Sequence, residues 1–386
     1  MKKKLKLLIV AGARPNLMKI SPLIEAIRKH NKNSRAQIKY SLVYTGQHYD
    51  KLMSEVFWKD LRLPKPDFDL KVGSATHAVQ TAKIMIGFER VCNKLMPDMV
   101  VVVGDVNSTL ACALVASKLG IKIAHVESGL RSFDRSMPEE INRVVTDHLS
   151  DHLFVTEKSG IRNLIREGNN KENMHLVGNV MIDTLLKFRK HAKASNILKR
   201  LGIGRNTLYA LLTLHRPSNV DDRVKFRTLT DALVVLSKYA TVIFPVHPRT
   251  EKMLKRYGLH NFFSLHTKSS KPANIHKNRI NCIDPLSYID FVKLMMHAKF
   301  VLTDSGGIQE ETTILGIPCL TIRENTERPA TIEHGTNILV GCSTEKIIAE
   351  SKKILRGDIK VRKKGHLKLW DGKAAKRIIR ILLRTV

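Results

Sequence analysis

The chain has 386 residues, and its 66 lysines and arginines exceed its 35 aspartates and glutamates to leave a formal net charge of +31. A hydrophobic fraction of 43% is ordinary for a globular protein and argues against disorder. No apolar run reaches the ~18 residues of a membrane-spanning helix, which argues against membrane insertion. The five cysteines are widely spaced and form no CxxC pair, so we expect neither a disulfide scaffold nor a cysteine zinc site, and a reducing, cytoplasmic setting fits best.

The first predicted element is a buried strand at residues 5–11. The lysines before it imitate the start of a secretory signal, but the apolar stretch at 7–11 is short for one, and Arg14 and Pro15 follow at once. Apolar runs then alternate with helix-length segments, which predicts a parallel sheet covered on both faces. The further strands expected here are 39–45, 99–104, 122–126 and 153–156, and the helices include 18–30, 78–96 and 108–119.

A basic, polar segment at 191–206 interrupts this alternation, which then starts again. The sequence therefore predicts an α/β protein with two doubly wound parallel-sheet domains in tandem. A last helical segment at 374–383 can pack on either domain. The strands expected in the second half are 208–214, 241–246, 300–303 and 318–322, and the helices include 223–238 and 288–298.

The isoelectric point near 10.1 favours an anionic partner: a nucleic acid, an anionic membrane surface or a phosphorylated substrate. The basic residues are spread along the chain, although they are denser at 2–6 and 356–384, and no nucleic-acid-binding motif accompanies them. A lysine-rich solvated surface is the simpler interpretation, so no nucleic-acid partner is expected.

Polar motifs follow several predicted strands, where parallel sheets bind their ligands. In residues 11–23, Gly12 permits a tight turn and Arg14 and Lys19 lie near the start of the next helix, which suits a phosphate or carboxylate. The segment has neither the GxGxxG pattern nor the Walker lysine, so a standard dinucleotide or NTPase loop is excluded. A turn with solvated basic residues is an equal alternative.

Carboxylates follow two neighbouring strands and open the next helix. Asp105 and Glu127 each come directly after a buried strand, and Glu139 and Glu140 begin the helical segment after 137. Helix capping readily explains one carboxylate in such a position, but it explains three less well. Proton transfer, in contrast, needs paired carboxylates. We therefore predict catalytic roles for Asp105, Glu127 and Glu139, and a structural role for Glu140.

Histidines mark three further places. His148 and His152, read as one helical turn apart, could ligate a metal, but HExxH and a third ligand are missing and no metal site is predicted. His215 follows a strand of the second domain and is the stronger functional candidate. His247 follows the next strand, where a satisfied loop residue is an equal alternative.

Residues 301–318 carry the strongest local signal. Ser305, Gly306 and Gly307 follow a strand and open a helix, so they can wrap a diphosphate at a helix N-terminus. Glu310 or Glu311, one turn further, can accept hydrogen bonds from ribose hydroxyls. The string DSGG also surrounds trypsin-like nucleophiles, but those lie in antiparallel barrels without a following helix. Arg323 and Arg328 lie downstream on the same predicted sheet edge.

These motifs together resemble the non-hydrolysing UDP-N-acetylglucosamine 2-epimerases. The matching segments keep the family's order from residue 12 to about 341: GARPNLMKISPL, TGQH, VVGDVNST, HVESGLRS, MPEEINR, VGNVMIDTL, TLHRPSNV, PVHPRT, TDSGGIQEE and TERPATIEHGTN.

The resemblance implies a GT-B architecture, with two Rossmann-like domains, an active site in the cleft between them, and in most members a homodimer. It places residues 1–180 and a returning helix at 370–386 in the N-terminal domain and residues 181–369 in a C-terminal UDP-binding domain. The implied reaction removes the C2 proton of a UDP-sugar while UDP leaves C1, and re-adds UDP to the glycal after reprotonation on the other face. It needs neither NAD nor a metal.

The resemblance also implies roles for individual positions. Asp105, Glu127 and Glu139 align with the family's proton-transfer carboxylates, and His215 with the histidine that assists the departing diphosphate. Arg14 and Lys19 align with residues near the substrate, and Ser305, Gly306, Gly307, Glu311 and Arg328 align with nucleotide-binding positions. Arg131 and His247 are further candidates for binding substrate or UDP.

The chain departs from the family where Tyr49 and Asp50 follow TGQH, in place of residues that bind an activating second UDP-sugar in many bacterial members, and this argues against allosteric activation. Other segments resemble the branch that acts on modified sugars such as UDP-2,3-diacetamido-glucuronate or UDP-N-acetyl-fucosamine types. The alternatives are that modified substrate, a GT-B glycosyltransferase, a hydrolysing epimerase, or a basic nucleic-acid- or surface-binding protein.

Overall fold

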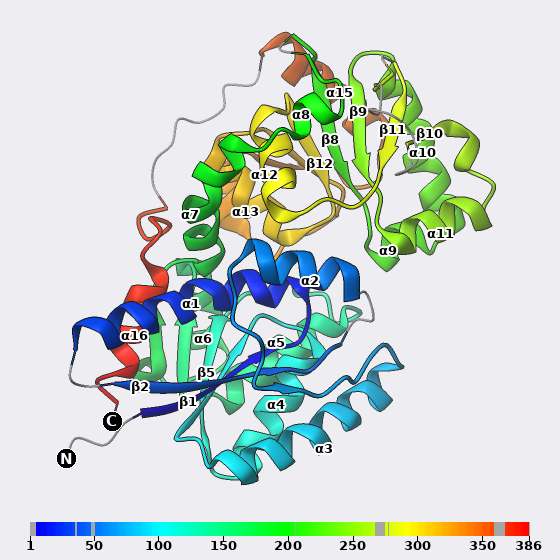
Figure 1. Ribbon diagram of the computed structural model, residues 1–386. Coiled ribbons are helices and arrows are strands. Elements are labelled where there is room, and N and C mark those ends of the chain that lie inside the picture. The colour runs from blue at the N-terminus through cyan, green and yellow to red at the C-terminus, as the bar shows by residue number, and fades with distance from the viewer. Residues whose placement is uncertain are drawn as a thin grey trace. The chain divides into compact units, whose positions relative to one another are not determined.

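A computed structural model describes residues 5–34, 37–47, 51–204, 206–266, 275–276, 278–358 and 367–385. Tyr49 and Asp50 and the lysines at 2–4 lie outside these ranges. The chain forms two compact units, residues 1–187 with 367–386 and residues 188–366, each built around one sheet (Figure 1). Among the described residues, no helix has the length and apolar character needed to span a bilayer.

Within its described residues, unit 1 contains a seven-stranded sheet in the order β3-β2-β1-β4-β5-β6-β7, and all its recorded pairings are parallel. The central strand β4 is a continuous apolar run, and β1 is apolar except for Lys6, as expected for strands covered on both faces. The strands are β1 (Leu5–Ala11), β2 (Ile38–Tyr44), β3 (Phe68–Asp69), β4 (Met99–Val103), β5 (Lys122–Ser128), β6 (His152–Val155) and β7 (Met174–Leu176).

The helices of unit 1 follow the strands in chain order. They are α1 (Arg14–Asn33), α2 (Lys51–Asp60), α3 (His77–Leu95), α4 (Asn107–Lys118), α5 (Pro138–Leu149), α6 (Lys158–Arg166) and the C-terminal α16 (Ala374–Leu382), with a 3₁₀ turn at Lys171–Asn173; α7 (Val180–Ala194) runs from this unit into the next.

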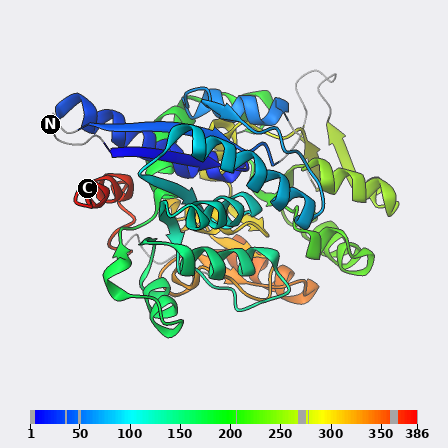
Figure 2. The same ribbon diagram turned by 90° about the horizontal axis from the view of Figure 1, so that it is seen from below.

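The two faces of this sheet are covered by different helices. Leu8 and Val10 of β1 pack with Phe88 of α3 and Cys112 of α4 in one apolar core. Because side chains alternate along a strand, Leu7 and Ile9 point to the opposite face, which α1 covers. The C-terminal helix α16 packs beside α1, so the last residues of the chain complete a layer begun by the first (Figures 1 and 2).

Unit 2 repeats the plan with a second seven-stranded sheet among its described residues, in the order β10-β11-β9-β8-β12-β13-β14. The strands are β8 (Tyr209–Thr213), β9 (Thr241–Pro245), β10 (Phe263–His266), β11 (Ile280–Ile283), β12 (Phe300–Thr303), β13 (Cys319–Thr321) and β14 (Asn337–Leu339). The helices are α8 (Ile197–Arg200), α9 (Pro217–Val220), α10 (Arg223–Ser237), α11 (Pro248–Arg256), α12 (Tyr288–His297), α13 (Gly306–Leu315), α14 (Pro329–Glu333) and α15 (Thr344–Arg356), with a 3₁₀ turn at His260–Phe262.

The core of unit 2 lies between this sheet and the helices α10, α11 and α15. Leu212, Phe244 and Leu302 of the central strands pack with Phe226 of α10 and Ile347 of α15, and all five side chains are almost completely buried. This apolar layer fixes the central strands, so the turns that follow β8, β9 and β12 are held at one edge of the sheet.

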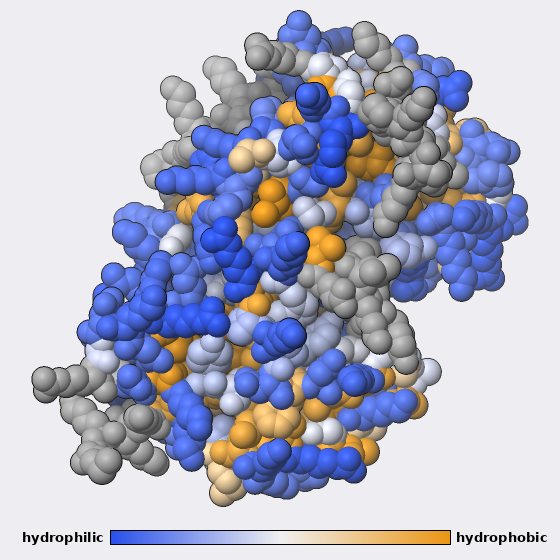
Figure 3. All heavy atoms as spheres, viewed as in Figure 1, coloured by the Kyte–Doolittle hydropathy of each residue, from blue (hydrophilic) through white to orange (hydrophobic). Residues whose placement is uncertain are grey.

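Hydrophilic residues cover much of the face drawn in Figure 3, with smaller hydrophobic patches between them. This appearance fits the composition, in which charged residues make up 26% of the chain.

Candidate functional site

The predicted carboxylates of unit 1 lie at the carboxyl ends of adjacent strands. Asp105 follows β4, and Glu127 lies near the end of β5, the strand that pairs directly with β4. Glu139 is half-buried in the first turn of α5, next to the buried Glu140. The two strand-end carboxylates are therefore brought to one edge of the sheet, as the sequence predicted for motifs after parallel strands.

Glu127 is held in an unusual conformation. Its φ of 76° lies in the left-handed region that non-glycine residues seldom adopt, and the β5–β6 register shifts between Val126 and Ser128. Lys19 of α1 forms an ion pair with Glu127, and both side chains are buried. Gly104 leaves the space for this lysine, because a Cβ there would lie 2.5 Å from Lys19 Nζ. The predicted anion-binding lysine thus contacts a protein carboxylate.

Arg143 joins Asp105 to Glu140. Its Nε donates to Asp105 Oδ2 at 2.9 Å, and its Nη1 donates to Glu140. Glu140 also accepts hydrogen bonds from the backbone N–H groups of Ser132 and Phe133, at 3.0 and 2.8 Å. This arrangement gives Glu140 a structural role and fixes the Asp105 carboxylate from the protein side. The sequence analysis did not identify Arg143, because the only sequence signal for its role was its position one helical turn after Glu139 and Glu140.

A second buried cluster contains His125, Asp147, Arg131 and Glu167. His125 Nδ1 lies 2.6 Å from Asp147 Oδ1, and Arg131 Nη2 lies 2.7 Å from Asp147 Oδ2 and 2.6 Å from Glu167 Oε2. Burial disfavours the Arg131 charge, but Glu167 and Asp147 more than compensate and raise the pKa of the guanidinium. Arg131 Nη1 also donates to the Leu130 carbonyl at 2.7 Å. The geometry therefore favours a structural role for Arg131 over the substrate contact expected from the sequence.

The histidine spacing predicted in residues 147–153 is wrong. Helix α5 ends at Leu149, so His148 is helical whereas His152 begins β6. The His152 ring stacks on His175, with ring centroids 5.6 Å apart. The neighbouring residue Asp147 belongs instead to the buried cluster with His125. The sequence signal for that cluster was a single histidine, His125, within an apolar strand.

The other predicted cation of unit 1, Arg14, lies at the start of α1. Its guanidinium stacks on the ring of Phe57 in α2 at 5.1 Å. Pro15 follows at the second position of the helix, where the missing N–H costs nothing.

In unit 2, Asp304 at the end of β12 organises the turn after β8. It is fully buried, and its Oδ2 accepts hydrogen bonds from the backbone N–H groups of His215 and Arg216 at 2.9 and 2.8 Å. Its Oδ1 lies 3.0 Å from His215 Nδ1. Burial alone would raise the pKa of Asp304, but His215 and these backbone donors lower it to about 2. The predicted catalytic histidine is thus oriented by the buried carboxylate of Asp304, a residue to which the sequence analysis assigned no role.

The predicted diphosphate turn is formed by Ser305, Gly306 and Gly307, which lead from β12 into α13. The Ser305 side chain does not cap this helix. A Cβ at Gly306 would lie 2.2 Å from Arg328 Nη1, so only glycine admits this close approach. Arg328 is itself held by Glu310, at 2.8 Å from its Nε, and by Glu327. A helix N-terminus with a guanidinium beside it is a suitable place for a phosphate group.

Glu311 lies one turn into α13 and is almost completely buried. Burial raises its pKa to about 7, although a hydrogen bond donated by Tyr288 Oη at 2.7 Å acts in the opposite direction. The expected ribose acceptor therefore already accepts one hydrogen bond from the protein.

His247 caps helix α11, because its Nδ1 accepts the backbone N–H of Arg249 at 3.2 Å. Its ring lies 5.8 Å from that of His215. The turns that carry these rings are joined by Thr250, whose Oγ1 donates to the Leu214 carbonyl at 2.6 Å.

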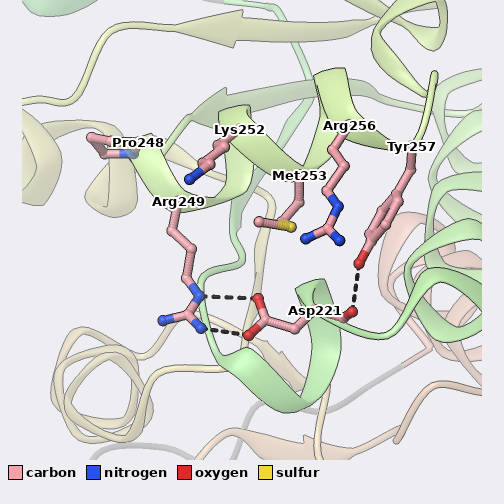
Figure 4. Close-up of a pocket in the computed structure, with 7 residues that line it drawn as sticks. All are labelled: Asp221, Pro248, Arg249, Lys252, Met253, Arg256 and Tyr257. Carbon is pink, nitrogen blue, oxygen red and sulfur yellow. Dashed lines mark hydrogen bonds and ion pairs between the residues drawn. The ribbon is translucent and has the colours of Figure 1, made fainter. Parts of the chain in front are cut away.

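A pocket of about 510 Å³ lies beside these turns (Figure 4). In it, Arg249 of α11 makes a two-point ion pair with Asp221 at the end of α9, and Tyr257 Oη donates to the Asp221 carbonyl at 2.5 Å. These contacts hold the end of α9 against α11. Lys252, Met253, Arg256 and Pro248 complete the lining.

Comparison with known families identifies the family of this chain. The model of the family described as UDP-N-acetylglucosamine 2-epimerase matches residues 30–383. The chain belongs to this family. The expected family and the α/β fold with two parallel sheets are confirmed.

Similar epimerases come from archaea and bacteria. The UDP-N-acetylglucosamine 2-epimerase of Methanocaldococcus jannaschii is 43% identical over 98% of this chain and 99% of its own length. The UDP-2,3-diacetamido-2,3-dideoxy-D-glucuronate 2-epimerase of Pseudomonas aeruginosa is 38% identical over 90% of this chain and 92% of its own. A crystal structure of the M. jannaschii epimerase with UDP-GlcNAc and UDP has a TM-score of 0.87 at 42% identity, covering 98% of this chain and 100% of that one.

Proposed function

We propose that this family member is a non-hydrolysing UDP-N-acetylglucosamine 2-epimerase that interconverts UDP-GlcNAc and UDP-ManNAc. The observation that carries the proposal is the pair of carboxylates, Asp105 and Glu127, at the ends of the adjacent strands β4 and β5. Cations hold both of them, Arg143 the first and Lys19 the second. The epimerase relatives, 43% identical across the chain, support the same activity.

The proposed reaction begins with transfer of the C2 proton to a carboxylate. The electrons of the C2–H bond form the C1=C2 double bond of a glycal, and the C1–O bond breaks with its electron pair leaving on UDP. Return of a proton to the opposite face of C2 and attack of the UDP oxygen on C1 give the epimer. We assign these proton transfers to Asp105, Glu127 and Glu139, since paired carboxylates suit acid–base work at one centre.

The groups of unit 2 suit the departing diphosphate. The amides at Ser305–Gly307 and the positive end of the α13 dipole stabilise negative charge, with Arg328 beside them. His215 is oriented through Nδ1 by Asp304, so its Nε2 can donate to a phosphate oxygen when the ring is protonated. The proposal requires one substrate molecule to reach both sets of groups. It involves neither NAD nor a metal.

Incubation with UDP-GlcNAc in deuterated water tests the activity. We expect deuterium at C2 and formation of UDP-ManNAc, read by NMR and mass spectrometry. Asp105→Asn and Glu127→Gln should each lower the rate by ~10²-fold or more, as expected for general acid–base groups. Glu89→Gln, at an exposed position on α3, is the matched control and should leave the rate unchanged. Wild-type-like turnover in both carboxylate variants would refute their roles.

UDP-2,3-diacetamido-2,3-dideoxy-D-glucuronate should be tested in the same assay. The relative from Pseudomonas aeruginosa that acts on this sugar is 38% identical. A panel with UDP-GlcNAc, this uronate and UDP-N-acetyl-fucosamine-type sugars distinguishes the substrates by C2 exchange. Release of free N-acetylmannosamine would instead indicate a hydrolysing epimerase, and sugar transfer to an acceptor a glycosyltransferase.

We also propose that the enzyme acts as a homodimer, as the family resemblance implies. Light scattering should then give a mass of twice the 43.7 kDa chain, and the chain mass itself would reject the proposal. The cytoplasmic location remains a prediction from the cysteine pattern.

A further inference from the structure

His125 occupies an unusual place for a histidine. It lies within β5, two residues before Glu127, and its side chain is completely buried. Both ring nitrogens have a close polar neighbour: Nε2 lies 2.8 Å from the Gly104 carbonyl oxygen, and Nδ1 lies 2.6 Å from Asp147 Oδ1. The proposed reaction does not use this ring.

The two neighbours decide where the protons lie. A carbonyl oxygen can only accept, so Nε2 must carry a hydrogen. Asp147 Oδ2 accepts from the Gly129 N–H at 3.0 Å and faces Arg131 Nη2 at 2.7 Å, which favours an ionised carboxylate. Although burial acts to raise the pKa of Asp147, its contacts with His125 and Arg131 lower it overall. An ionised carboxylate also only accepts, and Nδ1 must therefore carry a second hydrogen.

Charge balance supports the same assignment. Among the residues that the structure describes, the charged groups in direct contact within this cluster are Asp147, Arg131 and Glu167, with one cation between two anions. A neutral His125 would leave one uncompensated negative charge in a largely buried cluster, which is costly, whereas a positive ring makes the cluster neutral.

We propose that His125 is a buried imidazolium that positions the turns carrying Asp105 and Glu127. Its Nε2 fixes the carbonyl of Gly104, the residue directly before Asp105. Through Asp147 it fixes the N–H of Gly129, two residues after Glu127. One ring thus ties together the ends of β4 and β5. The positioning role rests on the proposed function, whereas the protonation state does not.

The protonation state is measured on the unmodified protein. Neutron diffraction from deuterium-exchanged crystals near pH 7.5 should show deuterium on both ring nitrogens of His125. His297 is the internal control, because burial and the nearby Lys293 lower its pKa and it should carry one deuterium. A single deuterium on His125 would overturn the proposal, whatever reaction the protein catalyses.

The positioning role is tested with His125→Gln, whose amide can still donate to Gly104 but has no charge for Asp147. Provided that circular dichroism and the melting curve show a folded protein, kcat for C2 exchange should fall roughly 10²-fold with KM within about threefold, because misplaced groups slow the chemical step. His148→Gln on the exposed side of α5 should match the wild type. An unchanged kcat in folded His125→Gln would refute positioning. If that variant does not fold, the neutron measurement still decides the charge.

Discussion

Because residue 306 is a glycine, Arg328 can lie close to the start of helix α13 in unit 2. A Cβ added there would lie 2.2 Å from Arg328 Nη1 and 2.8 Å from Glu327 Oε1. Arg328 has little freedom to move away, because it is buried and paired with Glu310 and Glu327.

Gly306→Ala should therefore lower the free energy of unfolding by about 1–3 kcal/mol, as for other overpacked sites, and weaken UDP binding. Urea unfolding and titration calorimetry measure the two effects. Gly204→Ala is the control, since among the described residues a Cβ there meets only Thr207 Oγ1, at 3.5 Å. Equal stability and UDP affinity in Gly306→Ala and the wild type would contradict the close approach.

Glu311 links stability to pH. Its pKa is raised to about 7 because burial disfavours the charged form, whereas the unfolded chain has an ordinary glutamate value near 4.5. Between these values the folded state binds more protons than the unfolded state, so this group's contribution to stability falls as pH rises from about 4.5 to about 7.

Glu311→Gln is neutral at every pH and should remove that part of the pH dependence. Above about pH 8 the variant should be at least as stable as the wild type, judged by urea unfolding across the pH range. Glu251→Gln, an exposed residue of α11 paired with Lys255, should leave the pH profile unchanged. A parallel profile for Glu311→Gln and the wild type would show that folding does not raise the pKa of Glu311.

The sequence allowed the positions of the principal site residues to be predicted, but not their partners. Asp105 and Glu127 follow apolar runs, and parallel pairing places such residues at one sheet edge. The partner of Glu127 is Lys19, 108 residues away in the chain (127 − 19), and no periodicity encodes that contact. The same holds for Arg143 and Asp105, and for His125 and Asp147, whose contacts arise only when β4, β5 and α5 are assembled.

At the scale of elements, α16 is anchored to unit 1 by its first turn. The Asp183 carboxylate accepts the N–H groups of Ala374 and Ala375 at 3.1 and 2.8 Å, which satisfies two of the donors that a helix leaves unpaired at its start. Just before the helix, Trp370 Nε1 donates to the Thr156 carbonyl at 3.1 Å.

Asp183→Ala should lower the free energy of unfolding by about 0.5–2 kcal/mol, the range for a lost helix cap, and speed amide exchange in α16. Hydrogen exchange followed by mass spectrometry resolves the helix from the rest of unit 1. The exposed Asp231→Ala in α10 serves as control. Unchanged exchange in α16 would mean that its apolar face alone anchors it.

Element prediction succeeded for most of the central strands, but it missed the edge strands and also β11, a buried inner strand of unit 2. The predicted strands at 5–11 and 300–303 coincide with β1 and β12, whose residues are almost all buried. Strands β3 and β7, two and three residues long, were not predicted, because so short an edge strand leaves no apolar pattern.

At the scale of the whole molecule, the interruption at 191–206 predicted that the chain forms two units. In the structure, the boundary between them lies between residues 187 and 188. The apolar pattern of the last helical segment did not decide which unit receives it, whereas the family resemblance placed it in the N-terminal domain. That choice depends on complementary apolar faces, and Ile378, Ile379 and Leu382 of α16 are buried in unit 1.

This return of α16 has a consequence for biosynthesis. The ribosome makes residues 1–187 first, yet the layer beside α1 lacks its last helix until residues 367–385 have emerged. Unit 2, whose residues form one uninterrupted stretch, is fully translated earlier. During translation the nascent first unit therefore exposes the apolar surface that α16 later covers. At this stage a chaperone can bind that surface.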